Sequence, residues 1–288
     1  MLLTDDFLLR LERLSIAARR LAAGMPHGGH VSRRRGPSVE FRQHRAYTPG
    51  DDPRTIDWNA AARLGHPFVK EFAAEEAVHV GVLIDASASM AYGEPPKIEA
   101  AQQIAAAVAY VALAGLDAVS VFAFADTLRE IVPTARGKHA VVPAFRAIEK
   151  IRTGGRTDFR ALPDEMLRGR TILFVVTDFY DRRYARTLRS LRRRRFEINL
   201  VHLISPQETR PPEGRLILED METGEQRRVT ITPREAAAYG ERFEAYLASL
   251  ETFALENELN YVRIGSADPI EDSVTKILRG SRMLQQRK

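Results

Sequence analysis

The sequence predicts an α/β fold, an open and mostly parallel six-stranded sheet with one antiparallel edge strand and helices on both faces. Three observations predict it. From about residue 77 onward, short apolar runs alternate with longer segments of helical periodicity. The run at 78–84 is apolar almost throughout and rich in β-branched residues, as expected of a strand buried on both faces. The 288 residues, 44% of them hydrophobic, suffice for one large domain with a smaller appendage.

Six short apolar segments are predicted to be the strands of this sheet. They are residues 78–84, 118–124, 128–132, 171–177, 196–203 and 260–264. Only residues 125–127 separate the second segment from the third. So short a connection forces an antiparallel hairpin, because a parallel crossover needs about a dozen residues or more. We therefore expect the strand at 128–132 to be the antiparallel edge strand.

Six longer segments are predicted to be the helices that cover the sheet. They are residues 97–115, 138–150, 158–167, 182–194, 233–257 and 269–278. Two further strand-like runs, 215–219 and 227–231, flank Gly224 and predict a surface hairpin, inserted at about 206–232. The main domain is therefore expected to span residues 77–288.

Residues 1–76 are predicted to form a separate N-terminal segment, made of a helix and a small β segment. Apolar side chains recur there at helical spacing, which predicts a helix that docks through this stripe. They are Phe7, Leu11, Leu14, Ala18 and Leu21. Short alternating runs at 39–41 and 68–72 are strand-like, and a compact polar segment at 45–58 lies between them.

That polar segment carries two cations and two carboxylates around a Pro-Gly turn. They are Arg45, Asp51, Arg54 and Asp57. We expect these side chains to pair with one another, with Trp58 as their apolar anchor, and to lock the N-terminal segment onto the main domain. Direct contact of the same residues with a partner is the alternative that the sequence leaves open.

The candidate functional residues begin directly after the first predicted strand. The loop Asp85-Ala86-Ser87-Ala88-Ser89 places one carboxylate and two hydroxyls at alternate positions. In open α/β sheets, ligands bind at the edge formed by the carboxyl ends of the strands. One charged and two neutral oxygen ligands suit a hard cation such as Mg²⁺. The loop therefore indicates a metal-dependent binding module.

Two further segments bring oxygen ligands to the same edge of the predicted sheet. The glycine-rich segment 154–158 contains Thr157, and Asp178 follows the apolar strand at 171–177. We therefore expect five side chains to converge, namely Asp85, Ser87, Ser89, Thr157 and Asp178. The alternative is that the two aspartates cap turns and Thr157 caps a helix. For Asp158 we favour the capping role.

The order and composition of these loops resemble the metal-ion-dependent adhesion site of von Willebrand factor A-like (Rossmann-like) domains. The resemblance implies that Ser87, Ser89 and Thr157 bind the metal directly, while Asp85 and Asp178 supply negative charge. It further implies an open coordination position that an acidic residue of a protein partner fills. The expected cofactor is Mg²⁺, for which Mn²⁺ would substitute.

The polar segment at 45–58, the Val69-Lys70 pair and the metal loop together resemble the bacterial domain-of-unknown-function family fifty-eight. Members of that family are von Willebrand A-like proteins typically encoded beside MoxR-type AAA+ ATPases. The hairpin at Glu222-Thr223-Gly224 also fits the family, and the similarity covers the chain from about residue 28. The resemblance implies an adaptor or co-chaperone role with such an ATPase and its client, in the cytoplasm.

The net charge of +5 has its most visible sources in two arginine clusters, at 33–35 and 192–195. We interpret the second cluster as the solvated face and C-terminal end of a helix, where cations suit the helix dipole. Binding of nucleic acid or an anionic surface is the alternative, although the clusters carry no interleaved aromatic residues for base stacking. The sequence contains no cysteine and no apolar segment long enough to span a membrane.

The sequence favours binding over catalysis. A phosphatase of the haloacid dehalogenase type needs a second aspartate two residues after Asp85, where Ser87 stands. The chain has no G-x-S-x-G elbow, no phosphate-binding G-x-x-x-x-G-K-[ST] loop and no H-E-x-x-H zinc motif. His202 lies within an apolar strand, where a core role is expected. A divergent metal-dependent hydrolase is the enzymatic alternative that remains.

Overall fold

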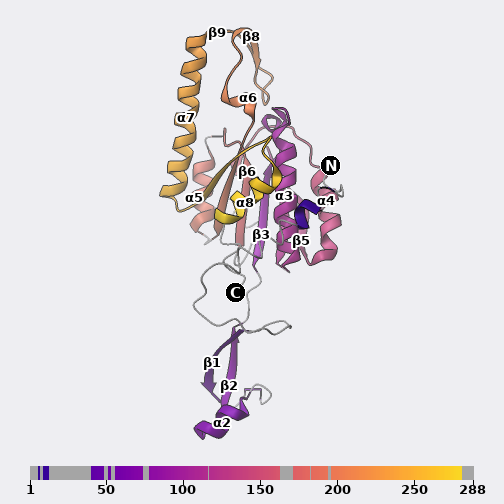
Figure 1. Ribbon diagram of the computed structural model, residues 1–288, viewed down its shortest axis with the longest axis vertical. Helices are drawn as coiled ribbons and strands as arrows, with labels where there is room; N and C mark the ends of the chain where they lie inside the picture. Colours follow the sequence, from indigo (N-terminus) through magenta and orange to yellow (C-terminus); the bar gives the residue numbers. More distant parts are fainter. Residues whose placement is uncertain are drawn as a thin grey trace. The chain divides into compact units, whose positions relative to one another are not determined.

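The computed structural model describes residues 6, 9–12, 40–48, 51–52, 56–73, 78–115, 117–162, 171–181, 183–193 and 196–280 (Figure 1). The chain divides into two compact units. The smaller unit is Pro26–Ala77, and the larger combines Met1–Met25 with Val78–Lys288.

The larger unit is built on a six-stranded sheet with the order β10-β7-β6-β3-β4-β5. Its strands are β3 (His79–Asp85), β4 (Ala118–Phe124), β5 (Leu128–Arg136), β6 (Thr171–Thr177), β7 (Glu197–Ile204) and β10 (Asn260–Gly265). All neighbours are parallel except β4 and β5, which pair antiparallel at the edge. The predicted fold class and its antiparallel edge strand are therefore confirmed.

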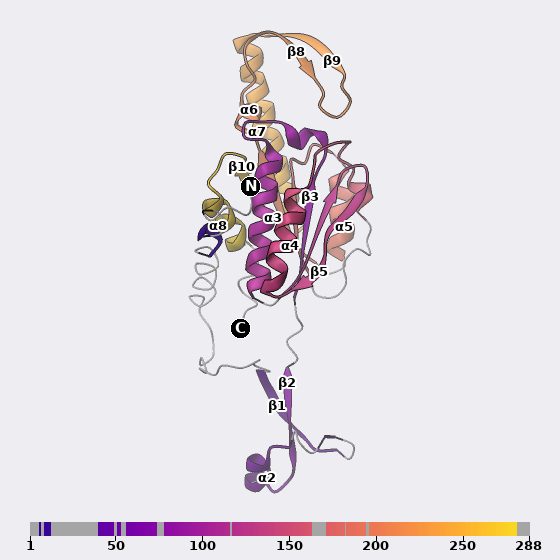
Figure 2. The ribbon, with the colours of Figure 1, turned by 90° about the vertical axis from the view of Figure 1, so that its right-hand side faces the viewer.

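Helices cover both faces of this sheet, so the central strands are buried on both sides. The helices are α3 (Lys97–Ala114), α4 (Val141–Glu149), α5 (Tyr184–Arg193), α6 (Pro206–Thr209), α7 (Pro233–Glu256) and α8 (Ile270–Gly280). Helices α3, α4 and α8 pack on one face, and α5 and α7 on the other (Figures 1 and 2). Because both faces are covered, β4 and β6 are buried at every position.

The helix predicted at 158–167 is not formed in its first part. Asp158 caps a single 3₁₀ turn at Phe159–Ala161, which confirms the capping role expected of Asp158. Leu162 then takes an extended backbone conformation, with φ −83° and ψ 102°. The reason is the proline that follows at position 163, because a residue before proline is disfavoured in the helical region. The rest of the predicted helix lies outside the described residues.

The predicted surface hairpin is present as β8 (Gly214–Glu219) and β9 (Gln226–Ile231), which pair antiparallel. The hairpin connects α6 to α7 and folds back over the end of the sheet where β3 terminates (Figure 2). Most of its side chains are exposed. No helix among the described residues has the length and apolar character that crossing a bilayer requires.

The smaller unit contains two antiparallel strands, β1 (Glu40–Ala46) and β2 (Phe68–Ala73), and the helix α2 (Trp58–Leu64). The helix α2 was not predicted from the sequence. Its first residue, Trp58, was assigned to the polar segment at 45–58. Its ends are set by local contacts, since the Asp57 carboxylate accepts hydrogen bonds from the amides of the first turn. Gly65 ends α2 in the left-handed conformation, with φ 74°.

The predicted boundary of 1–76 placed the N-terminal segment together with the smaller unit. In the structure, Met1–Met25 belongs to the larger unit instead. Leu11 is fully buried in the core of the larger unit, and Arg10 Nε lies 3.5 Å from a carboxylate oxygen of Glu271. The segment packs on the larger unit because its apolar stripe, which includes Leu11, has to be covered by another apolar surface. The other predicted members of that stripe lie outside the described residues.

Truncating Leu11 to alanine is expected to lower the free energy of unfolding by about 2–5 kcal/mol, because a cavity replaces a buried side chain. Leu9→Ala is the matched control, since Leu9 is 57% exposed in the same helical segment. Urea unfolding monitored by circular dichroism measures both. Equal stability of the two variants would show that Leu11 is not part of the core.

Candidate metal centre

The predicted metal loop begins at the carboxyl end of β3 and is tightly folded on itself. Asp85 is the last residue of β3, and its Oδ1 accepts a hydrogen bond of 2.9 Å from the Ser87 amide. The hydroxyl oxygens of Ser87 and Ser89 lie 3.1 Å apart. Asp85 and Ser87 are fully buried, whereas Ser89 is partly exposed. The loop thus points its polar atoms inward, with Ser89 closest to solvent.

The glycine-rich loop is fastened to the metal loop by two backbone hydrogen bonds. The amide of Ala88 donates to the Gly155 carbonyl at 3.1 Å, and that of Gly154 donates to the Ala86 carbonyl at 2.8 Å. Gly155 has φ +74°, and a Cβ atom there would lie 2.1 Å from a carboxylate oxygen of Asp126. Only glycine fits this position. These contacts hold Thr157 beside the metal loop.

Side-chain hydrogen bonds then join all five predicted oxygen ligands. Thr157 Oγ1 donates to Asp85 Oδ2 at 3.2 Å, and Ser89 Oγ donates to Asp178 Oδ2 at 2.8 Å. Together with the contacts within the metal loop, these hydrogen bonds form one continuous series. It runs from Thr157 through Asp85, Ser87 and Ser89 to Asp178. The structure therefore brings the five residues together from three loops. Their role as metal ligands stays a prediction.

Asp178 is followed by a strained residue. Phe179 has φ 58°, an uncommon conformation for a bulky side chain. Its ring is buried and packs against Phe159, Tyr184 and His202. This packing opposes the backbone strain and fixes the turn that carries Asp178 into the site.

The donor set fits a hard divalent cation. Two carboxylates and three hydroxyls provide only oxygen atoms, which Mg²⁺ prefers in proteins. No group of three or more His, Cys, Asp or Glu side chains suited to a metal occurs among the described residues. A metal at this site would therefore depend on the hydroxyls of Ser87, Ser89 and Thr157.

Burial makes the Asp85 carboxylate basic. Loss of solvent raises its pKa to about 7, and the negative charge of Asp178 acts in the same direction. Hydrogen bonds from the Thr177 hydroxyl, at 2.6 Å to Oδ2, and from Ser87 oppose the rise. A bound cation would reverse this balance by favouring the ionised form.

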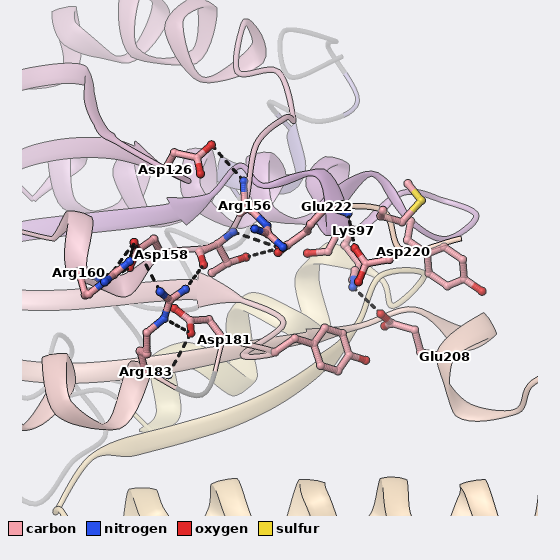
Figure 3. Close-up of a pocket in the computed structure, with 15 residues that line it drawn as sticks. Lys97, Asp126, Arg156, Asp158, Arg160, Asp181, Arg183, Glu208, Asp220 and Glu222 are labelled. Carbon is pink, nitrogen blue, oxygen red and sulfur yellow. Dashed lines mark hydrogen bonds and ion pairs between the residues drawn. The ribbon is translucent and has the colours of Figure 1, made fainter. Parts of the chain in front are cut away.

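Sequence reasoning missed Lys97, which places a fully buried ammonium group beside Asp178. Lys97 Nζ lies 2.8 Å from Asp178 Oδ2. It forms a second ion pair with Glu208 (Figure 3). Burial alone would lower the pKa of Lys97, but the charges of Asp178 and Glu208 outweigh it and raise the pKa. The available signal was a lysine in the first turn of a helix, where the dipole disfavours cations.

Sequence reasoning also missed the role of Glu222, which reaches the site from the turn between β8 and β9. Its Oε1 accepts a hydrogen bond of 3.1 Å from the amide of Thr157. It lies 3.0 Å from the Thr157 hydroxyl, whose one proton it shares with Asp85 Oδ2. The sequence predicts Glu222-Thr223-Gly224 only as part of a surface hairpin. The contact of Glu222 with Thr157, 65 residues earlier, depends on how the hairpin folds back and has no local signal.

The site opens into a pocket of about 760 Å³ that is lined mainly by charged side chains. The cations are Lys97, Arg156, Arg160 and Arg183, and the carboxylates are Asp126, Asp158, Asp181, Glu208, Asp220 and Glu222 (Figure 3). Carboxylates outnumber cations, and Asp85 and Asp178 lie buried beside them. The pocket therefore favours a cationic ligand.

The polar cluster of the smaller unit is formed in part. The Arg45 guanidinium donates to Asp51 at 2.8 Å, and with help from Thr48 it lowers the pKa of Asp51 to about 2. Asp57 caps α2, as described above, and Arg54 lies outside the described residues. Trp58 is 68% exposed, so the smaller unit itself does not bury it. Its role as an anchor onto the main domain stays a prediction.

The described part of the second arginine cluster is engaged with neighbouring residues. Arg192 forms an ion pair with Glu258, while Arg189 donates to Asn257 at 3.2 Å and lies over the Phe253 ring. These contacts agree with the interpretation of α5 as a helix with a solvated cationic face. The cluster at 33–35 and residues 194–195 lie outside the described residues.

The strand order, with β3 central and β5 antiparallel at the edge, makes the larger unit an open, mostly parallel α/β domain, the fold class that the sequence predicts. Residues 43–248 match the family described as "Protein of unknown function DUF58", and the chain belongs to that family. Uncharacterized proteins of Mycobacterium bovis and Mycobacterium tuberculosis are 27% identical over 233 residues, which is 77% of this chain and 73% of theirs. The predicted family is confirmed; the association with a MoxR-type ATPase stays a prediction.

Similar solved structures include the conserved hypothetical protein BatB from Bacteroides thetaiotaomicron, with a TM-score of 0.42 and 14% identity over 71% of this chain and 98% of that chain. A von Willebrand factor type A structure from Catenulispora acidiphila has a TM-score of 0.40 and 14% identity, over 76% and 43%. Proximal thread matrix protein 1 from the mussel byssus, with a zinc occupied MIDAS motif, has a TM-score of 0.39 and 13% identity, over 69% and 45%. These similarities concern the fold.

Proposed function

We propose that this chain is a non-enzymatic binding module that holds a divalent cation, Mg²⁺ or Mn²⁺, and through it captures an acidic side chain of a protein partner. One observation carries the proposal. The five predicted oxygen ligands, which come from three loops, are joined by hydrogen bonds beside a pocket rich in carboxylates. When bound, the cation would supply positive charge at the carboxyl edge of the sheet.

The charges around the site bear on how an incoming carboxylate would be bound. Lys97 pairs with both Asp178 and Glu208, so its charge is already balanced by Glu208. Asp85 and Asp178 then balance the charge of a divalent cation held between them. A further carboxylate would therefore be attracted by an open coordination position on the cation and not by an excess of positive charge in the pocket. Ser89, which is partly exposed and lines the pocket, marks the side from which that carboxylate would enter.

As the partner we propose a MoxR-type AAA+ ATPase or its client, with this chain as adaptor or co-chaperone. The choice of partner rests on the family resemblance described from the motifs at 45–58 and 85–90. The proposal predicts a coordinated contact, which moderate salt screens less than exposed charges. A mechanism based on the arginine clusters would instead be independent of metal and strongly weakened by salt.

Saturating Mg²⁺ or Mn²⁺ is expected to stabilise the chelator-stripped protein by roughly 2.7 kcal/mol at a concentration about 100 times the dissociation constant. Ser87→Ala and Thr157→Ala should lose this stabilisation, because each removes one hydroxyl ligand. Ser249→Ala, at an exposed serine of α7, is the matched control and should keep it. Scanning calorimetry measures all four proteins. A wild type whose melting temperature is indifferent to both metals would contradict the metal site.

The partner is tested by a pull-down of the ATPase with wild-type protein, Asp85→Ala and a variant neutralised at Arg192–Arg195. We expect retention by the wild type to require metal and to survive moderate salt, and retention by Asp85→Ala to be lost. The arginine variant should bind as the wild type does. Retention by Asp85→Ala in chelator, together with loss in the arginine variant, would overturn the proposed mechanism.

A further inference from the structure

We propose that Glu222 is an internal acidic ligand of the candidate metal centre, which the β8–β9 hairpin delivers to the place where a partner's acidic side chain would bind. The inference rests on the proposed function, since it assigns a residue of this chain to the open coordination position. It adds a competitor within the chain, which a partner has to displace.

The contact between Glu222 and Thr157 is specific. One carboxylate oxygen of Glu222 accepts from the amide of Thr157 at 3.1 Å and lies 3.0 Å from its hydroxyl. The same hydroxyl lies 3.2 Å from Asp85 Oδ2, and Thr157 is only 3% exposed. Glu222 therefore meets a predicted metal ligand itself, and it lines the pocket (Figure 3), as Ser89 also does.

The turn that carries Glu222 is built to present it. Asp220 Oδ1 accepts from the amides of Glu222 and Thr223, at 2.9 and 2.8 Å. The amide of Gly224 donates to the Asp220 carbonyl at 2.7 Å, and Gly224 takes the left-handed conformation with φ 71°. These bonds close a tight turn with its backbone fixed. Because the turn is ordered in advance, little entropy is lost when Glu222 binds.

The hairpin itself is held weakly by apolar packing, so its tip can be displaced. Ile217, Leu218 and Met221 are exposed, and most other positions of β8 and β9 are exposed as well. The contact of Glu222 with Thr157 therefore contributes a large part of what ties the tip to the domain. A hairpin with few buried apolar contacts opens at low cost in free energy.

A tethered carboxylate has a high effective concentration at its site, on the order of millimolar for a short tether. A partner carboxylate of modest affinity therefore binds only if further contacts help to displace Glu222. The three exposed apolar side chains of the hairpin are available for such contacts. The arrangement selects a partner that presents both an acidic residue and an apolar surface.

The experiment compares wild type, Glu222→Gln and the control Glu219→Gln, with Mn²⁺ alone as the probe. Glu219 lies on the same hairpin, where its carboxylate accepts from Gln226 at 2.9 Å. We expect Glu222→Gln to weaken Mn²⁺ binding about tenfold, because the site loses one negatively charged ligand. In hydrogen exchange, Mn²⁺ should protect the amides of residues 220–224 in the wild type and the control, but not in Glu222→Gln.

Equal Mn²⁺ affinity of wild type and Glu222→Gln, or tighter binding by Glu222→Gln, would overturn the inference while leaving the metal centre intact. Unchanged exchange at 220–224 on adding Mn²⁺ to the wild type would also overturn it. If the wild type binds Mn²⁺ no better than Ser87→Ala does, the proposed function fails, and this inference fails with it. The two failures are therefore distinguished by the wild-type titration.

Discussion

Replacing Asp85 with asparagine is expected to stabilise the metal-free protein above pH 7 and to abolish its stabilisation by Mg²⁺. Burial, and next to it the charge of Asp178, raises the pKa of Asp85 from 3.8 to about 7. The folded protein therefore holds this proton more tightly than the unfolded chain does. The contribution of Asp85 to the free energy of unfolding is fully present below about pH 4, and it is lost as the pH rises to about 7.

The size of the effect follows from the shift, because one pKa unit corresponds to about 1.4 kcal/mol. The gain for Asp85→Asn at pH 8 is therefore at most about 4 kcal/mol, and it should vanish near pH 4. Asparagine keeps the shape of the side chain, and its one oxygen can accept from Thr157 and Thr177. Its NH2 group then faces the Ser87 amide, which is also a donor, so the gain stays below the full value. Asparagine cannot ionise, so the cost of burying a charge disappears.

Urea unfolding in chelator at pH 5 and pH 8 measures this effect, with Asp272→Asn as control at an exposed carboxylate of α8. Other groups titrate in this range, but the difference between wild type and Asp85→Asn isolates Asp85. Adding Mg²⁺ should stabilise the wild type more at pH 8 than at pH 5, since the ligand must be deprotonated. A difference that stays the same at both pH values would contradict the assignment.

The strands of the main sheet were predictable because they are buried on both faces. For β4 (Ala118–Phe124) and β6 (Thr171–Thr177) the predicted and observed bounds agree, since burial on both faces makes most positions apolar. The buried polar exceptions are Ser120, Thr171 and Thr177. The antiparallel edge strand followed from a connection of three residues alone. Helix α2 was not predicted, because its short length is set by the capping contacts of Asp57 and Gly65 rather than by an apolar stripe.

The candidate site was predictable where its residues follow strand ends. Asp85 and Asp178 each stand at the carboxyl end of a strand, and parallel strands bring those ends to one edge of the sheet. Glu208 and Glu222 were not predictable as members of the site, and the signal for Lys97 was limited to its unfavourable place in the first turn of α3. Their places depend on tertiary contacts between segments that are distant along the chain, which leave no periodic pattern in the sequence.

Lys97→Met is expected to lower the free energy of unfolding by about 3–5 kcal/mol, because it leaves Asp178 and Glu208 buried without their cation. Both carboxylates keep hydrogen bonds, from Ser89 and from the Ser205 amide, but these donors carry no charge. Lys138→Met is the matched control at an exposed lysine and should change stability by no more than about 0.5 kcal/mol.

In Lys97→Met, a bound divalent cation should compensate for the missing positive charge of the lysine. With the ammonium group gone, Asp178 is free to give its whole charge to a divalent cation, so Mg²⁺ should stabilise Lys97→Met more than it stabilises the wild type. Adding Glu208→Gln should recover part of the lost stability without metal, because it removes one of the two unpaired charges. Urea unfolding with chelator and with saturating Mg²⁺ measures both effects. If Lys97→Met is no less stable than Lys138→Met, or gains no more from Mg²⁺ than the wild type, then Lys97 and the cation do not share Asp178.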